Sequence, residues 1–216
     1  MDWTERARRF RDLHRPGSPF LLPSVDPVGA RDLAAMGFAA AEARSIAALD
    51  GALLVCVAVE GATPDLVARW IEAGCVGVRL DDAGLADDAA LERVRAIAGV
   101  SADLVVTACS HRHLEGGTLD DSLERLTRYR EAGARVVEAP GLRRAEHIRR
   151  VVDELEVVNV TLGLGGVPPS MTVLAELGVA RVSTGRVLPE LGIGSARLAL
   201  REMLEHGTFE FLVELD

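Results

Sequence analysis

The sequence contains no lysine, so all 24 of its basic Lys and Arg positions are arginines. Arginine cannot form a Schiff base with a carbonyl, and its pKa is too high for base catalysis. The absence therefore excludes lysine-dependent aldolases, pyridoxal-phosphate enzymes and P-loop nucleotide-binding enzymes. We expect neither pyridoxal phosphate nor a nucleotide as cofactor.

Signals for disulfides, zinc and membranes are also lacking. The three cysteines, Cys56, Cys75 and Cys109, form no CxxC pair, and no HExxH motif is present. These spacings predict reduced thiols and no preformed zinc site. No apolar run approaches the roughly 20 residues that span a bilayer. The first residues, MDWTERARRFRDLH, are charged and do not resemble a signal peptide. We expect a cytoplasmic protein without a membrane partner.

A basic surface is missing as well. The net charge is −9, and a phosphate backbone needs a basic face, so a nucleic-acid partner is not expected. What the sequence does have is length and apolar content: 216 residues, of which 49% are hydrophobic. That is enough for one sizeable core, and no linker interrupts the chain. We therefore expect one domain over 1–216.

Short apolar runs alternate with helical patterns along the whole chain. The expected strands are 20–26, 53–60, 76–81, 103–109, 134–140, 157–163 and 180–185. The expected helices are 4–14, 29–36, 40–49, 64–73, 87–98, 119–132, 143–155, 169–177 and 194–206. Continuous apolar strands between helices predict a parallel sheet that is covered on both faces.

The number of strands leaves two architectures open. A closed (β/α)8 barrel needs eight strands, and seven are evident. The shortfall lies between Gly37 and Leu53, where FAAAEARSIAALDG reads as one helix and only 38–40 could be a stub of strand. An open doubly wound sheet is the alternative. In both architectures the chemistry is expected where the strands end.

Five phrases follow one another along nearly the whole chain: FRDLHRPGSPFLLPSVDPVGARDLAAMGF, IEAGCVGVRLDD, LDDSLERLTRYREAGARVVEAPGL, VVNVTLGLGGVPPSMTVLAELGVARVSTG and LALREMLEHGTF. In this order they resemble the isocitrate lyase/phosphoenolpyruvate mutase superfamily. The resemblance implies a (β/α)8 barrel whose second strand is reduced or missing. It also implies a homo-oligomeric lyase or mutase that acts on small 2-oxo acids through an enolate held on Mg²⁺. In this family the C-terminal helix often exchanges between subunits.

The sequence departs from the family pattern where that chemistry is done. The strand-three metal motif reads AVEGAT, with Ala58 at the first acidic position. The strand-five arginine position is Cys109, in TACSHR. The loop after strand four is reduced to AGLA, and the second strand with its loop is expected to be deleted.

Glu60 and Asp81 are the candidate metal ligands. They end neighbouring expected strands, and two carboxylates at one barrel mouth can hold a hard cation such as Mg²⁺. The alanine at position 58 weakens this site, and solvated loop acids are the alternative. Without a metal, their mutual repulsion would raise one pKa and leave an acid or base.

The stretch CSHRH at 109–113 places a thiol, two imidazoles and a guanidinium at one strand end. As a replacement site, Arg112 or His111 would bind a carboxylate, and Cys109 or His113 would move a proton. We take Cys109 and His111 as catalytic candidates and Arg112 and His113 as substrate-binding candidates. The alternative is a polar loop with a buried thiol.

Five more candidates lie at other strand ends. Asp26 is either catalytic or the N-cap of the following helix, and Ser24 precedes it as a substrate-binding candidate. Gly165, in the glycine-rich loop after strand seven, could present amides to an anion. Arg186 could supply the charge lost in strand five. Glu138 ends the sixth strand and matches the family only in a shifted alignment.

Three functions compete at this point. The first is a diverged lyase-type enzyme that breaks or forms a C–C bond of a small 2-oxo carboxylate, with doubtful use of Mg²⁺. The second is a non-catalytic member that binds a ligand or a partner and has kept only the fold. The third is an enzyme of another reaction class that uses Cys109 and His111.

Overall fold

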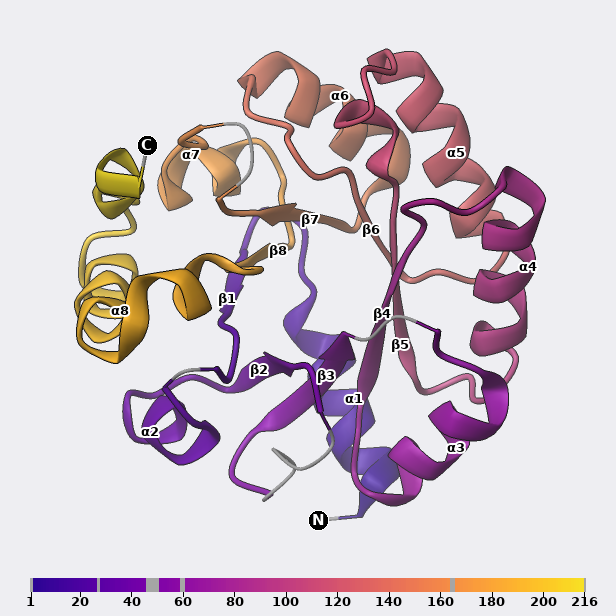
Figure 1. Ribbon diagram of the computed structural model, residues 1–216, viewed down its shortest axis with the longest axis horizontal. Helices are drawn as coiled ribbons and strands as arrows, with labels where there is room; N and C mark the ends of the chain where they lie inside the picture. The colour runs from indigo at the N-terminus through magenta and orange to yellow at the C-terminus, as the bar shows by residue number, and fades with distance from the viewer. Residues whose placement is uncertain (1, 27, 46–50, 59–60, 164–165, 216) are drawn as a thin grey trace.

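The centre of the molecule is an eight-stranded parallel sheet (Figure 1). The computed structural model describes residues 2–26, 28–45, 51–58, 61–163 and 166–215. The strands are β1 (Phe20–Leu22), β2 (Ala40–Ala43), β3 (Leu54–Ala58), β4 (Gly77–Asp81), β5 (Val105–Cys109), β6 (Val136–Glu138), β7 (Val158–Thr161) and β8 (Arg181–Ser183). The helices are α1 (Trp3–Leu13), α2 (Ala30–Ala35), α3 (Pro64–Glu72), α4 (Asp87–Ala98), α5 (Leu119–Glu131), α6 (Ala145–Leu155), α7 (Met171–Glu176) and α8 (Val187–Glu205).

The sheet curls into a nearly closed barrel. Its strand order is β1-β8-β7-β6-β5-β4-β3-β2, which leaves β1 and β2 as the two ends. These ends meet at a parallel bridge between Ser24 and Glu42, where Val25 N donates to Glu42 O and Glu42 N donates to Pro23 O, both at 2.8 Å. The barrel prediction is therefore confirmed, and the open doubly wound sheet is not what forms.

The helix expected over 40–49 is wrong at its beginning, because Ala40–Ala43 is strand β2. All four residues are buried, and they pair with β3 from Ala40 opposite Leu54 to Ala43 opposite Val57. Alanine favours a helix in isolation, but pairing and burial between two strands decide the outcome here. The second strand is thus present. Residues 46–50 lie outside the described part of the chain.

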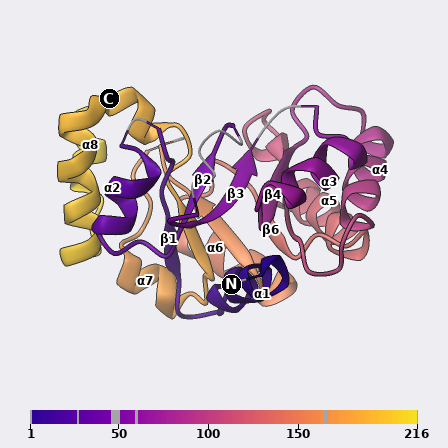
Figure 2. The same ribbon diagram turned by 90° about the horizontal axis from the view of Figure 1, so that it is seen from below.

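Helix α1 closes the amino-terminal end of the barrel. Figure 2 shows it beneath the strands, at the end from which they start. Its Ala7 and Phe10 are fully buried against the first residues of several strands. At Gly77 a side-chain carbon would lie 2.7 Å from Phe10 Cε1, so only glycine admits this ring. With that end filled, a ligand has the carboxyl-terminal end of the barrel to enter.

The remaining helices surround the barrel (Figure 1). Thr63 caps α3 by accepting a hydrogen bond from Leu66 N, and Thr118 forms a capping box with Asp121 at the start of α5. The last helix, expected over 194–206, begins earlier at Val187 and is kinked at Gly192, whose φ is 73°. Among the described residues, none of the helices is long and apolar enough to cross a membrane.

Candidate functional site

A cavity of about 670 Å³ opens at the carboxyl-terminal end of the barrel. We call it the mouth cavity. Its polar and charged lining consists of Ser24, Glu42, Arg44, Arg79, Asp81, His111, Thr161, Arg186 and Glu190. Strands β2, β4 and β7 supply Glu42, Arg79, Asp81 and Thr161, the segments that follow β1, β2, β5 and β8 supply Ser24, Arg44, His111 and Arg186, and Glu190 lies on α8. Ligand sites of barrel enzymes are built at this end, because the carboxyl ends of all the parallel strands meet there.

Arg79 is the best anchored cation of the mouth cavity. It points inward from the middle of β4, and its side chain is 17% exposed. Its Nη2 donates to Glu138 Oε1 at 2.9 Å and to Cys109 Sγ at 3.1 Å. Its Nε donates to Glu138 Oε2 at 3.2 Å, and its Nη1 donates to Asp81 Oδ2 at 3.2 Å. The guanidinium is therefore held by three neighbouring strands.

Glu138 provides the counter-charge and is fully buried. Besides Arg79, it accepts hydrogen bonds from Asn159 Nδ2 at 2.8 Å and Thr161 Oγ1 at 2.5 Å. Burial by itself would raise the pKa of Glu138, but the charge and hydrogen bonds of Arg79 and the Thr161 hydroxyl bring it below its ordinary value. Glu138 is thus a carboxylate at neutral pH.

A second buried arginine lies one layer below, on β8. Arg181 donates to Asn159 Oδ1 at 2.9 Å and Thr107 Oγ1 at 3.0 Å, and its Nη1 lies 3.2 Å from His14 Nε2. Burial and the charge of Arg181 lower the pKa of His14 to about 3, so this imidazole is neutral. Its Nδ1 lies 2.9 Å from Phe10 O, which assigns the proton to Nδ1 and leaves Nε2 as the acceptor for Arg181.

His111 is held by two carboxylates at the rim of the mouth cavity. Its Nδ1 lies 2.6 Å from Asp81 Oδ1, and its backbone N donates to Asp82 Oδ1 at 2.8 Å. Hydrogen bonds to Asp81 and Asp82 raise the pKa of His111 to about 9. Burial alone would raise the pKa of Asp82, but its bonds from His111, Tyr129 and Arg125 lower it to about 2. His111 is therefore an imidazolium at neutral pH.

Glu42 brings a different kind of carboxyl group to the cavity. It is 9% exposed, and its Oε2 is buried without a hydrogen-bond partner within the described parts of the chain. Burial raises the pKa of Glu42, and the nearby charge of Glu138 adds to the effect against the opposing charge of Arg79. This carboxyl group therefore holds its proton more tightly than an exposed glutamate does.

The structure brings together some of the residues predicted from the sequence. Ser24, Asp81, His111 and Arg186 line the mouth cavity. Ser24 N donates to Thr184 Oγ1 at 2.8 Å, and the Arg186 side chain is 79% exposed beside Glu190.

Two other predicted residues lie just beneath the cavity. Cys109 and Glu138 are fully buried and both contact Arg79. Burial raises the pKa of the Cys109 thiol well above its ordinary value, so it is protonated at neutral pH.

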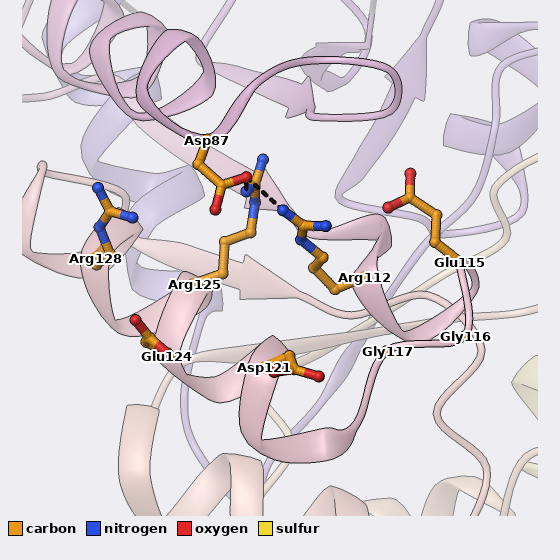
Figure 3. A pocket seen from close by; sticks show the side chains of 9 residues that line it. All are labelled: Asp87, Arg112, Glu115, Gly116, Gly117, Asp121, Glu124, Arg125 and Arg128. Atoms are coloured by element: carbon orange, nitrogen blue, oxygen red, sulfur yellow. Dashed lines mark hydrogen bonds and ion pairs between the residues drawn. The ribbon is translucent and has the colours of Figure 1, made fainter.

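Three predicted residues lie away from the cavity. Asp26 is exposed and does not cap α2, whose N-cap is Gly29. His113 packs edge-on against His147, with 6.4 Å between the ring centroids. Arg112 pairs with Asp87 in a separate polar cavity of about 470 Å³ between α4 and α5 (Figure 3).

Two further predicted residues, Glu60 and Gly165, lie outside the described residues.

Sequence reasoning missed Arg79, Glu42 and Thr161. A signal for Arg79 was available, since a charged residue in the short apolar run VGVRLD must point to the barrel interior if its neighbours point outward. Glu42 was hidden because its segment read as a helix. Thr161 carries no signal by itself, and only the register of β6 and β7 brings it to Glu138.

The residues described here do not fit the Mg²⁺ that the family resemblance implies. Mg²⁺ is usually bound by one or two carboxylates together with waters, and β3 ends at Ala58, which offers no side-chain oxygen, while Glu60 lies outside the described residues. Both oxygens of Asp81 are already occupied: Oδ1 by His111 Nδ1 and by Ala83 N at 3.0 Å, and Oδ2 by Arg79. The group of possible ligands found in the described chain is Asp81, Cys109 and His111, a softer donor set.

Comparisons with known proteins agree on one family. The family model described as phosphoenolpyruvate phosphomutase matches residues 59–204. Two solved Burkholderia cenocepacia J2315 structures are similar. One, provisionally described as a lyase/mutase, is 33% identical, with 97% of this chain and 91% of that chain covered and a TM-score of 0.78. The other, provisionally described as a phosphonomutase, is 26% identical, with 95% and 100% covered and a TM-score of 0.75.

A more distant likeness concerns the fold alone. The structure of oxaloacetate acetylhydrolase in complex with the product oxalate is 19% identical, with 98% of this chain and 94% of that chain covered and a TM-score of 0.72. No curated protein matches the chain in a sequence comparison.

Proposed function

The chain belongs to the phosphoenolpyruvate mutase/isocitrate lyase superfamily, and on this basis we propose that it is a lyase-type enzyme of small 2-oxo carboxylates. Members of this superfamily are lyases and mutases that act on oxo acids. The proposed reaction breaks or forms a C–C bond through an enolate. In the cleavage direction the hydroxyl proton passes to a base such as water, the oxygen's electron pair forms a new C=O bond as the C–C bond breaks, and the C–C electron pair becomes the enolate, which is then protonated.

The observation that carries this proposal is the guanidinium of Arg79 in the mouth cavity. A fixed cation that borders a cavity stabilises negative charge on the oxygens of an oxo acid and of its enolate. Arg79 is fixed by Glu138 and Asp81, and it lines a cavity large enough for a small carboxylate.

Two groups beside Arg79 can supply the proton that the enolate takes up. His111 is an imidazolium at neutral pH because Asp81 and Asp82 raise its pKa to about 9. Glu42 has a pKa raised by burial, its Oε2 has no hydrogen-bond partner within the described residues, and the residue lines the same cavity. A general acid needs its proton at working pH and must reach the reacting atom.

A substrate panel tests the proposal directly. Purified protein is incubated with oxaloacetate, 2-methylisocitrate or a phosphonate, with and without Mg²⁺, and the products are followed by proton and phosphorus NMR. We expect turnover of one of them by the wild type and by Arg95→Met, a change at an exposed arginine on α4, with loss of turnover in Arg79→Met. An absence of turnover across the panel would contradict the proposal.

A non-catalytic binding role is the second candidate. It is favoured by Ala58 and Cys109, which stand where the family pattern has an acid and an arginine. Under this alternative, oxalate binds the mouth cavity while none of the panel compounds is converted. Calorimetry with oxalate, carried out beside the NMR panel, separates the two candidates.

We also propose that the protein is a homo-oligomer that uses α8. This helix exposes three apolar side chains, Ile193 (53%), Leu198 (68%) and Leu204 (45%), and large apolar side chains exposed on a surface can mark an interface. In this arrangement the helix is either exchanged between subunits or packed against its copy in the partner subunit. Light scattering tests the proposal: we expect an oligomer that Leu198→Glu dissociates, and a monomeric wild type would contradict it.

A further inference from the structure

The cations of the mouth cavity differ in how firmly they are held. Arg44 and Arg186 are exposed, and the Arg186 side chain is exposed by 79%. Arg79 is 17% exposed and bonded to two carboxylates and a thiol. A ligand loses less binding free energy to side-chain ordering when its partner is already fixed, which favours Arg79 as the anchor.

The guanidinium of Arg79 still has a donor to offer. It carries five N–H groups in a fixed plane. Nε uses its one on Glu138, Nη2 uses two on Glu138 and Cys109, and Nη1 uses one on Asp81. The second N–H of Nη1 has no acceptor within the described residues, and Arg79 lines the cavity. A carboxylate oxygen of a ligand could accept this last N–H, so that all five donors of Arg79 would have acceptors.

The guanidinium of Arg79 also lies where it would repel a divalent cation bound to Asp81. Nη1 of Arg79 is 3.2 Å from Asp81 Oδ2, and the other oxygen of Asp81 is 2.6 Å from His111 Nδ1. A metal ion bound to Asp81 would meet the positive charge of Arg79 at short range in a partly buried site. It would also have to displace hydrogen bonds that Asp81 already makes. Both oxygens of the Asp81 carboxylate are thus already paired with protein side chains, those of Arg79 and His111.

We propose that Arg79 is the anchoring cation of the mouth cavity and takes the place of the metal ion, so that a small dicarboxylate binds without a divalent metal. Superfamily members generally use Mg²⁺, so this separates the chain from its relatives. Glu138 acts as the positioning residue, because its two oxygens fix the plane of the guanidinium. The inference rests on the proposed function for the class of ligand.

Calorimetric titration with oxalate tests the inference. Oxalate is a compact dicarboxylate, and the wild type is titrated once in EDTA and once in excess Mg²⁺. We expect dissociation constants that agree within about twofold, because the arginine supplies the charge. Arg79→Met should weaken binding by about 10- to 100-fold, the size expected for a lost charge-assisted pair. Arg79→Lys keeps the charge but loses the planar guanidinium, so its affinity for oxalate should lie between those of the wild type and Arg79→Met.

Controls keep the result interpretable. Arg95→Met removes an exposed arginine on α4 that pairs with Glu92 and should bind oxalate as the wild type does. If Arg79→Met fails to fold, the double variant Arg79→Met/Glu138→Gln removes both charges of the pair and is used instead, with circular dichroism as the check on folding. The double variant should show the same loss of oxalate affinity.

The outcomes separate this inference from the proposed function. Binding of oxalate that requires Mg²⁺, or unchanged affinity in Arg79→Met, would overturn the role of Arg79 and leave the carboxylate function standing. No binding of oxalate in either EDTA or Mg²⁺ would instead remove the proposed ligand class, and the inference with it. Metal-independent binding that depends on Arg79 supports the inference, and turnover in the substrate panel decides the proposed function separately.

Discussion

Replacing Glu138 by glutamine should destabilise the protein strongly, although the two side chains have nearly the same shape. Glu138 is fully buried and accepts bonds from Arg79, Asn159 and Thr161. A glutamine offers one oxygen and an NH2 group, so one donor would face another donor. The ionised counter-charge of Arg79 and of the nearby Arg181 would also be lost.

The expected size follows from the burial of this ion pair. Removing one partner of a buried pair costs about 3–5 kcal/mol, because the other charge remains without compensation. Arg79 keeps Asp81 as a partner and is 17% exposed, which reduces the cost. We therefore expect a loss of about 3 kcal/mol in the free energy of unfolding, at the lower end of that range.

Urea denaturation at neutral pH measures this loss. The matched control is Asp103→Asn, which removes the partner of Arg11 in a pair whose side chains are 26% and 37% exposed. Pairs near the surface contribute about 1 kcal/mol or less, so the control should unfold close to the wild type. If Glu138→Gln also unfolds within about 1 kcal/mol of the wild type, the barrel is not held by a charged pair as argued here.

Three further predictions concern titration and reactivity. His111 should titrate by NMR near pH 9, and Asp81→Asn should move its pKa toward the ordinary 6.5; a wild-type value near 6.5 would count against the pairing. Because this pKa is raised on folding, the stability that His111 contributes is full below pH 6.5 and is lost as pH rises through about 9. The raised pKa of Glu42 likewise means that its ionisation opposes folding above its ordinary pKa of 4.5, so Glu42→Gln should gain stability relative to the wild type between pH 5 and pH 8, as followed by thermal unfolding; an equal pH dependence would refute this. Cys109 is fully buried with a raised pKa, so iodoacetamide at neutral pH should leave it unmodified by mass spectrometry, whereas rapid labelling of the folded protein would show an accessible thiolate.

Much of the fold could be predicted because short segments of the sequence indicate each strand and helix. Apolar runs such as DLVVTAC and glycine-ended helices such as EAGC mark each strand–helix unit, and their order carries the family resemblance. The exception was β2, whose alanines favour a helix in isolation. Only pairing with β3 and the bridge between Ser24 and Glu42 make this segment a strand.

The candidate site was predictable in its place but not in its partners. Asp81 and His111 end neighbouring strands, and their meeting follows from parallel pairing. The position of Cys109 suggested a lost charge, with Arg186 as the substitute. In the structure Arg79 reaches Cys109 Sγ at 3.1 Å from the adjacent strand. The arginine is thus supplied by β4 and not by β5. Which side chains from different strands meet inside the barrel depends on the register of the strands, and no local sequence pattern shows it.

The most direct measurement is a crystal structure of the protein grown with both oxalate and Mg²⁺. The account predicts oxalate in the mouth cavity with a carboxylate oxygen within hydrogen-bond distance of Arg79 Nη1, and Asp81 still paired with His111. A magnesium ion coordinated by Asp81 and oxalate, with the Arg79 guanidinium turned away from the ligand, would contradict it.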